Sequence, residues 1–162
     1  MPPAVYVRLA TPDDASSITA VLRAAFAPFE ADYTPEAMAA TVVAPTEVRA
    51  RMAEGPVWVA LAGDAVVGTV AVLPRGSDLY VRGMAVAPEA QAAGVGGRLL
   101  AQAEAYARER GFTRLTLCTT PYLARAIRLY ERRGFRRVAE GPADLFGTPL
   151  FTMAKPLRSA GA

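Results

Sequence analysis

The feature that most constrains this chain is the stretch Gln91–Leu100, QAAGVGGRLL, in which three glycines fall within four positions. The alternating hydrophobic residues of Leu79–Val86 predict a strand before it, and the apolar spacing that starts at Val95 predicts a helix after it. A glycine turn that opens a helix presents unpaired backbone N–H groups at the positive end of the helix dipole, where phosphate binds readily. The stretch therefore favours a phosphate site, and a tight turn with close helix–strand packing is the alternative interpretation.

Two common nucleotide motifs do not fit this stretch. Gly94 and Gly96 match the first two glycines of the dinucleotide pattern G-x-G-x-x-G, but Leu99 stands where the third is needed. The preceding strand also follows a predicted hairpin and does not open a βα unit. The chain contains no Gly-Lys-Ser or Gly-Lys-Thr, which a nucleotide-hydrolysing P-loop requires. Hydride transfer and nucleotide hydrolysis are therefore poor interpretations.

Length and composition indicate a single globular domain. The 162 residues predict a single domain, 1–162, with a core of about 5–155. Hydrophobic residues make up 52% of the chain and charged residues 20%, as in an ordinary globular protein. No apolar run approaches the roughly 18 residues of a membrane span, and Met1–Asp14 lacks the layout of a secretory signal. We therefore expect a cytoplasmic protein that does not act in a membrane.

The absence of histidine restricts the chemistry. Without histidine, and with Cys118 as the single cysteine, the chain has no Ser-His-Asp or Cys-His mechanism, no His-ligated metal and no internal disulfide. We expect no metal site. The net charge of +3 suits a small anionic ligand and is too mild and scattered to predict binding of nucleic acid.

Periodicity and turn residues predict the order strand, helices, three strands, helix, strand, helix and two strands. Predicted helix starts are Thr11–Asp14, Thr34–Glu36, Thr46 and Thr120–Pro121, and predicted helix ends include Gly55, Gly111 and Gly134. The predicted strands are Val5–Leu9, Pro56–Leu61, Val66–Leu73, Leu79–Val86, Phe112–Cys118, Phe135–Ala139 and Leu150–Met153. This order predicts an α+β fold with one mixed, mainly antiparallel sheet flanked by helices.

Two segments carry a resemblance to a known family. Met84–Gly97, followed by Leu99 and Leu100, resembles the acyl-CoA signature of the GNAT family of N-acetyltransferases, whose core is Gln or Arg, two residues, Gly, one residue, then Gly or Ala. Gln91, Gly94 and Gly96 fill that core. Ala126–Phe135 resembles the family's second motif, A-x-x-L-Y-x-x-x-G-F. The predicted element order is similar to the family's along almost the whole chain.

The resemblance implies a GNAT-like fold with acetyl-CoA as co-substrate. A bulge would splay the strands Leu79–Val86 and Phe112–Cys118, and the pantetheine arm would pair with the main chain of the first strand. A backbone N–H there would polarise the thioester carbonyl, and Tyr130 would protonate the leaving thiolate. The implied cofactor-binding residues are Met84, Ala85, Val86, Gln91, Ala92, Ala93, Gly94, Val95, Gly96 and Gly97, of which Ala92–Gly97 would hold the pyrophosphate through main-chain N–H groups.

Several residues admit a structural interpretation or depart from the family pattern. Tyr130 lies on the same helical face as Leu123 and Ile127, so an ordinary core tyrosine is the alternative. Cys118 is interpreted as a packed, small apolar residue. Leu123 stands where some members place an asparagine, and Tyr80 where many place a glutamate. No general base is identified, and Asp78, Glu30 and bulk water are the candidates.

The acceptor pocket of the family lies between the first two helices and the last strand pair. In this chain that region would contain Phe26, Phe29, Tyr33 and the loop 141–147 with Asp144 and Phe146, while the loop 76–82 adds Tyr80 and Arg82. These aromatic residues predict a small, partly apolar amine, and packing alone is the alternative for Phe26 and Phe29. Arg82 would meet an anionic acceptor or face water.

Three functions remain from the sequence. The first is transfer of an acetyl group from acetyl-CoA to a primary amine of a small molecule or peptide. The second is a non-catalytic acyl-CoA-binding module that acts as a sensor or interaction protein. A third, weaker interpretation is an acyltransferase for longer acyl groups. The sequence maps no interface, so a homodimer is left open.

Overall fold

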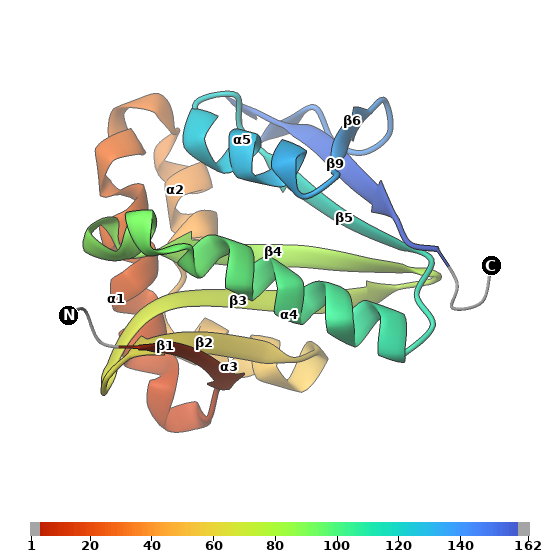
Figure 1. Ribbon diagram of the computed structural model, residues 1–162. Coiled ribbons are helices and arrows are strands. Elements are labelled where there is room, and N and C mark those ends of the chain that lie inside the picture. The colour runs from red at the N-terminus through yellow and green to blue at the C-terminus, as the bar shows by residue number, and fades with distance from the viewer. Residues whose placement is uncertain (1–3, 159–162) are drawn as a thin grey trace.

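A seven-stranded sheet forms the centre of the protein in the computed structural model, which describes residues 4–158 (Figure 1). The outermost residues of the predicted domain 1–162 lie outside that range. The strand order is β1-β2-β3-β4-β5-β9-β6, in which β4 and β5 are parallel and the other neighbours antiparallel. The strands are β1 (Val5–Leu9), β2 (Val57–Ala62), β3 (Ala65–Arg75), β4 (Asp78–Val86), β5 (Arg114–Thr119), β6 (Arg136–Val138) and β9 (Phe151–Pro156). The predicted α+β class with a mixed, mainly antiparallel sheet is confirmed.

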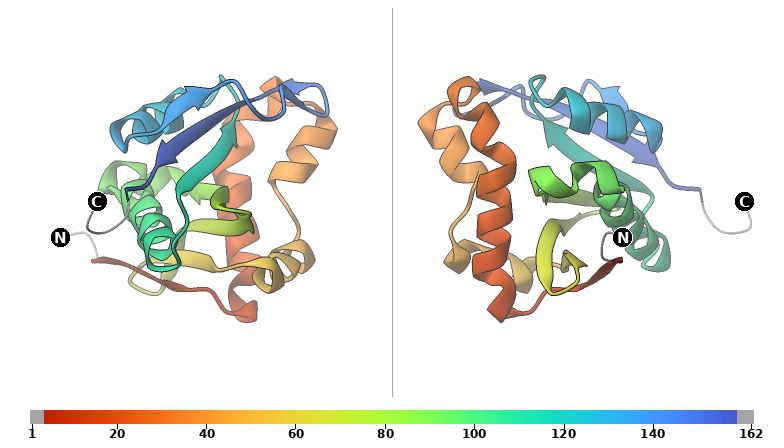
Figure 2. Two further views of the ribbon diagram at one scale, coloured as in Figure 1. Left: turned by 90° about the vertical axis from the view of Figure 1, so that its right-hand side faces the viewer. Right: turned by 60° about the vertical axis from the view of Figure 1, so that its left-hand side comes forward.

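Helices cover both faces of the sheet (Figure 2). One face carries α4 (Val95–Glu109) and α5 (Ala124–Arg132), and the other carries α1 (Ala15–Phe26), α2 (Pro35–Thr41) and α3 (Pro45–Glu54). Each layer has its own hydrophobic cluster, because alternate residues of the central strands point to opposite faces. Within residues 4–158, every helix is too short or too polar to cross a bilayer.

Most helix boundaries follow from local chemistry. The Thr34 hydroxyl accepts a hydrogen bond from the N–H of Ala37 at 3.2 Å and so caps α2 as predicted. Gly111 and Gly134 follow α4 and α5 with φ of +79° and +96°, the left-handed geometry that ends helices. The predicted start at Thr120–Pro121 is wrong, because α5 begins at Ala124. The Thr120 side chain is buried and lies 3.5 Å from the Tyr33 hydroxyl, so a tertiary contact uses it instead of a cap.

Two segments described as loops contain strand structure. Tyr80 and Arg82, named both in the predicted strand Leu79–Val86 and in a loop 76–82, lie within β4, so the strand prediction is the correct one. The loop 141–147 contains β7 (Asp144–Leu145), which pairs with β8 (Thr148–Pro149) in a small separate hairpin. Asp144 accepts a hydrogen bond from the N–H of Gly147 at 2.8 Å, a local turn contact that stabilises this hairpin.

The entry into α1 depends on Asp14, a mostly buried carboxylate. Asp14 accepts hydrogen bonds from the Arg8 guanidinium at 2.8 and 3.1 Å and from the N–H of Thr11 at 2.7 Å. The Arg8 contact holds the pKa of Asp14 below its ordinary value, against the opposing effect of burial. We expect Asp14→Asn to lower the free energy of unfolding by about 1–2 kcal/mol at pH 7, a moderate loss because the Arg8 side chain is 39% exposed.

The pH dependence of this loss follows from the direction of the pKa shift. Because the pKa of Asp14 is lowered in the folded state, its stabilisation is present above the unfolded value of about 3.9 and is lost as the pH falls through the folded value. Urea unfolding at pH 7 and below about pH 3 should therefore show the difference between the wild type and Asp14→Asn shrinking in acid. The exposed neighbour substitution Asp13→Asn is the control, with a change within about 0.5 kcal/mol.

Candidate active site

Strands β4 and β5 pair along only the first part of their length. Their parallel register runs from Asp78–Val81 against Arg114–Leu117 and then stops. On the other side of β4, Gly83 and Met84 together oppose Val70 of β3, which is a β-bulge. Gly83 has φ of +60° at this point. β4 and β5 meet at one end and diverge toward the other in Figure 1, so the edge of β4 after Val81 has no strand partner on the β5 side.

The glycine stretch leads directly into α4. Gly94 is the residue before the helix and has φ of +74°, and the first helical backbone bond runs from the N–H of Arg98 to the carbonyl of Gly94 at 3.2 Å. The N–H groups of residues 95–97 precede that bond, so the helix itself offers them no acceptor, and they lie at the positive end of the helix dipole. Gln91 donates from Nε2 to the carbonyl of Val86 at 3.4 Å, which ties the turn to the end of β4.

The three glycines have different structural surroundings. Gly94 adopts a left-handed conformation that other residues rarely adopt, and a Cβ there would meet nothing within 4 Å. A Cβ on Gly96 would lie 2.7 Å from Cδ2 of Leu129, and one on Gly97 would collide with the guanidinium of Arg133. Close packing therefore explains Gly96, which is crowded by both Leu129 of α5 and Met84 of β4, whereas the guanidinium near Gly97 is the movable end of a long side chain. The turn still leaves main-chain donors and open space at Gly94, which fits a phosphate group.

Three tyrosines from distant parts of the chain meet where β4 and β5 separate. Tyr130 projects from α5, is 8% exposed and packs against Phe135 with ring centroids 5.9 Å apart. Burial, with smaller effects of Tyr33 and Tyr80, raises the pKa of Tyr130 to about 12. Tyr130 is thus both part of the core and a protonated phenol near the other two tyrosines. Its catalytic role stays a prediction.

Tyr80 and Cys118 face one another across the end of the paired region. Burial raises the pKa of Tyr80 to about 12, and the Cys118 side chain adds to this shift. The Cys118 Sγ also lies 3.5 Å from the Thr152 hydroxyl. Cys118 is therefore half-buried among polar neighbours, in a more polar environment than the purely apolar one expected from the sequence.

The elements expected to form the acceptor side do come together. Phe26 and Tyr33 make an edge-to-face aromatic contact at 6.2 Å, and Phe29 is half-buried on the same 3₁₀ segment as Asp32. The β7–β8 hairpin joins them: Thr34 donates from its hydroxyl to the carbonyl of Phe146 at 2.9 Å and from its backbone N–H to the hydroxyl of Thr148 at 3.0 Å. Phe146 itself is exposed. Their roles in substrate binding remain predictions.

Of the candidate bases, Asp78 is badly placed. Arg114 donates to both oxygens of the Asp78 carboxylate, at 3.1 and 2.7 Å, at the paired end of β4 and away from the bulge. Glu30 is exposed on the 3₁₀ segment. Two residues that sequence reasoning did not select, Arg51 and Glu54 of α3, lie near Arg82 of β4. Their spacing in a polar helix carries no signal that could have identified them.

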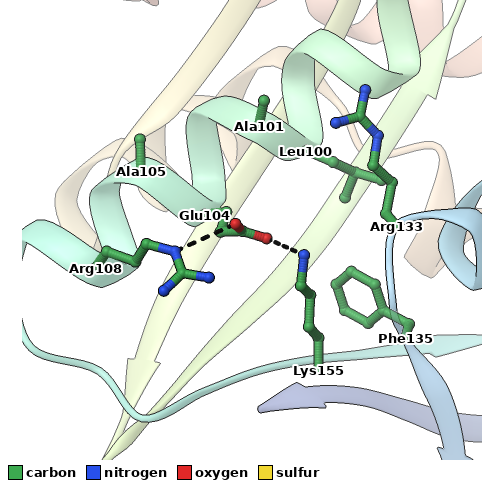
Figure 3. A pocket seen from close by; sticks show the side chains of 8 residues that line it. All are labelled: Leu100, Ala101, Glu104, Ala105, Arg108, Arg133, Phe135 and Lys155. Atoms are coloured by element: carbon green, nitrogen blue, oxygen red, sulfur yellow. Dashed lines mark hydrogen bonds and ion pairs between the residues drawn. The ribbon is translucent and has the colours of Figure 1, made fainter. Parts of the chain in front are cut away.

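A separate pocket of about 240 Å³ lies along α4 (Figure 3). Glu104 occupies its centre and pairs with Arg108 and Lys155, while Arg133 and Phe135 lie to one side. Glu104 is thus already paired with two cations, and neither Tyr130 nor the bulge of β4 lines the pocket. We therefore place the candidate active site at the divergence of β4 and β5 and not in this pocket.

The comparison with protein-family models found a match. The model of the acetyltransferase (GNAT) family matches residues 18–135, which include both motifs in full. No curated protein matches the chain.

Solved structures share the fold over nearly the whole chain. The crystal structure of PaiA N-acetyltransferase from Thermoplasma acidophilum in complex with coenzyme A has a TM-score of 0.82 and 15% identity, over 95% of this chain and 99% of that chain. An acetyltransferase of the GNAT family from Staphylococcus aureus has a TM-score of 0.80 and 14% identity, over 96% and 100%. Ribosomal-protein-alanine N-acetyltransferase from Brucella melitensis has a TM-score of 0.75 and 25% identity, over 94% and 99%.

Proposed function

Because the chain belongs to the acetyltransferase (GNAT) family, we propose that it transfers the acetyl group of acetyl-CoA to a primary amine of a small molecule or a peptide. Acyl transfer with acetyl-CoA as co-substrate is the activity of the family. The acceptor and the residue roles below are our proposal. The observation that supports it best is the convergence of three features at one place: the first-turn amides of α4, the unpaired edge of β4 and the buried phenol of Tyr130.

The main chain supplies the binding groups. The N–H groups that start at Ala92 and run through the first turn of α4 are suited to the pyrophosphate of acetyl-CoA, because those of the first turn have no acceptor within the helix and lie at the positive end of its dipole. The edge of β4 from Met84 to Val86 is suited to the pantetheine arm, which can complete the ladder that β5 leaves open. The thioester supplies the acetyl group, and an N–H of this segment polarises its carbonyl.

Tyr130 acts on the leaving sulfur. Its pKa of about 12 keeps the phenol protonated at neutral pH, so it can donate a hydrogen bond to sulfur as negative charge develops there. A thiol has a pKa near 8.5, which makes complete proton transfer from the phenol unfavourable by itself. The acceptor nitrogen loses a proton when it becomes an amide, and this proton balances the one that the thiolate gains. Neutral amine and thioester thus give amide and thiol.

A thiol-release assay tests the proposed function. Wild-type protein and acetyl-CoA are incubated with a panel of amino acids, polyamines, aminoglycosides and peptides with free N-termini, and coenzyme A binding is measured in parallel by calorimetry. We expect binding and an amine-dependent release of thiol. Tight binding without release from any amine would favour the non-catalytic acyl-CoA-binding module. Absence of binding would contradict both interpretations.

A further inference from the structure

Two arginines near the bulge of β4 have buried donor atoms without hydrogen-bond partners. Within the described part of the chain, Nε and Nη2 of Arg82 and Nε of Arg51 are the buried side-chain nitrogens that lack one. Arg82 is the first residue of β4 after the last pair with β5, between Val81 and Leu117. An unsatisfied buried donor of this kind is costly, more so when it is charged, and therefore indicates a missing acceptor.

The two free nitrogens of Arg82 form a specific binding edge. Nε and Nη2 lie along the same edge of the planar guanidinium and together bind the two oxygens of a carboxylate. The same protein shows this geometry in use, since Arg114 donates from its Nε and Nη2 to the two oxygens of Asp78 at 3.1 and 2.7 Å. Arg82 presents the same pair of atoms without such a carboxylate.

The surroundings of Arg82 favour an anion. Nη1 of Arg51 lies 2.8 Å from the place where a Cβ on Gly83 would stand, which brings a second guanidinium to the bulge. Burial first, and then repulsion by Arg82, lower the pKa of Arg51. The guanidinium of Arg75 lies 3.9 Å from the ring centre of Tyr80, so a third arginine is close by.

One carboxylate partly balances these charges. Oε1 of Glu54 lies 3.3 Å from Nη2 of Arg82, within ion-pair distance but outside hydrogen-bond geometry. The Glu54 side chain is 45% exposed, in contrast to the buried atoms that it covers. It can therefore move into solvent when a better-aligned carboxylate replaces it.

The position of Arg82 on β4 shows where a carboxylate bound to it would place the acceptor amine. Tyr80 and Arg82 alternate with Leu79 and Val81, which pack toward α4, so they point to the face that carries α1–α3. Met84, the first residue of the segment proposed to pair with the pantetheine arm, is two residues further along the strand, across the bulge. A carboxylate held at Arg82 would leave an amine a few bonds away next to that segment.

We propose that the acceptor is a small amine that also carries a carboxylate, of which an amino acid is the simplest example, and that Arg82, assisted by Arg51, binds this carboxylate in place of Glu54. The proposal rests on the proposed function and names its substrate class. The carboxylate of the acceptor supplies the two aligned oxygens that the buried edge of Arg82 lacks.

Calorimetry on the coenzyme A-bound protein tests the proposal without requiring turnover. The common amino acids, β-alanine and γ-aminobutyrate are each compared with the corresponding amide, which keeps the amine and removes the negative charge. We expect at least one acid to bind about 10- to 100-fold more tightly than its amide, the range for charged hydrogen bonds. Arg82→Gln should reduce this ratio to near one, and Arg82→Lys should restore it only in part because lysine lacks the fork.

Two further variants separate binding from folding. Glu54→Gln should tighten the binding of the acid several-fold, the opposite sign to Arg82→Gln, whereas damage to the fold would weaken binding in both. The control is Arg49→Gln, which removes one positive charge, as Arg82→Gln does, from an exposed arginine on α3. It should leave the ratio of acid binding to amide binding unchanged. Equal binding of acids and amides, binding of no acid, or an unchanged ratio in Arg82→Gln would overturn the proposal. In each case thiol release from other amines would still support the proposed function.

Discussion

Replacing Tyr130 by phenylalanine is expected to lower kcat about 100-fold, with the dissociation constant of coenzyme A changed by less than about twofold. The loss lies at the low end of general acid catalysis because a thiolate is already a fair leaving group. Phenylalanine preserves the ring that packs against Phe135 and removes only the hydroxyl. Steady-state thiol release and calorimetry of coenzyme A on the same preparation measure the two quantities.

The control for this substitution is Tyr106→Phe in α4. The half-buried Tyr106 ring packs edge-to-face on Trp58 at 5.6 Å, so it too is a tyrosine that packs against the hydrophobic core, but it lies away from the divergence of β4 and β5. Its kcat should remain at the wild-type value. If Tyr130→Phe also retains the wild-type kcat, the residue is a core tyrosine and the proposed role is wrong.

Replacing Phe135 by alanine should lower the free energy of unfolding by about 3–5 kcal/mol, the range for a fully buried phenylalanine. Phe135 is 1% exposed and is among the largest side chains that the fold buries completely. It follows the glycine that ends α5 and joins this helix to the core shared with α4. A domain of this size has a total stability of only about 5–15 kcal/mol, so the loss is a large fraction. Urea unfolding followed by circular dichroism measures it.

The matched control is the same substitution at an exposed site. Phe146 is 63% exposed in the turn of the β7–β8 hairpin, and Phe146→Ala should change the free energy of unfolding by about 0.5 kcal/mol or less. Similar losses for the two variants would contradict the burial argument. Partial unfolding of Phe135→Ala under native conditions is an extreme form of the expected result.

The predicted element order holds along the chain because the signals that carry it are local. The hairpin of β2 and β3, the helix after Gly94 and the cap at Thr34 each depend on residues a few positions apart. The prediction of a helix start failed where a polar residue could either cap a helix or make a tertiary contact. Thr120 has the residue type of a helix cap, but in the fold its side chain faces Tyr33.

The glycines show a similar limit at the site. A glycine required for backbone conformation, such as Gly94, looks the same in the sequence as one required for packing, such as Gly96. The positions of Leu129 on α5 and Met84 on β4 distinguish them. In the same way, Asp78 appeared free to act as a base until its pairing with Arg114 was known.

By itself, the sequence determined the periodicity of the elements, the glycine turn that opens α4 and the two motifs of the family, because each is encoded within a short segment. The tertiary structure decided which side chains lie near one another, so that Tyr33 and Tyr80 affect the pKa of Tyr130 and Arg82 affects that of Arg51. These contacts join different helices and strands, and their geometry depends on a bulge and on the divergence of two strands. Such contacts arise from packing between elements, which no local pattern specifies.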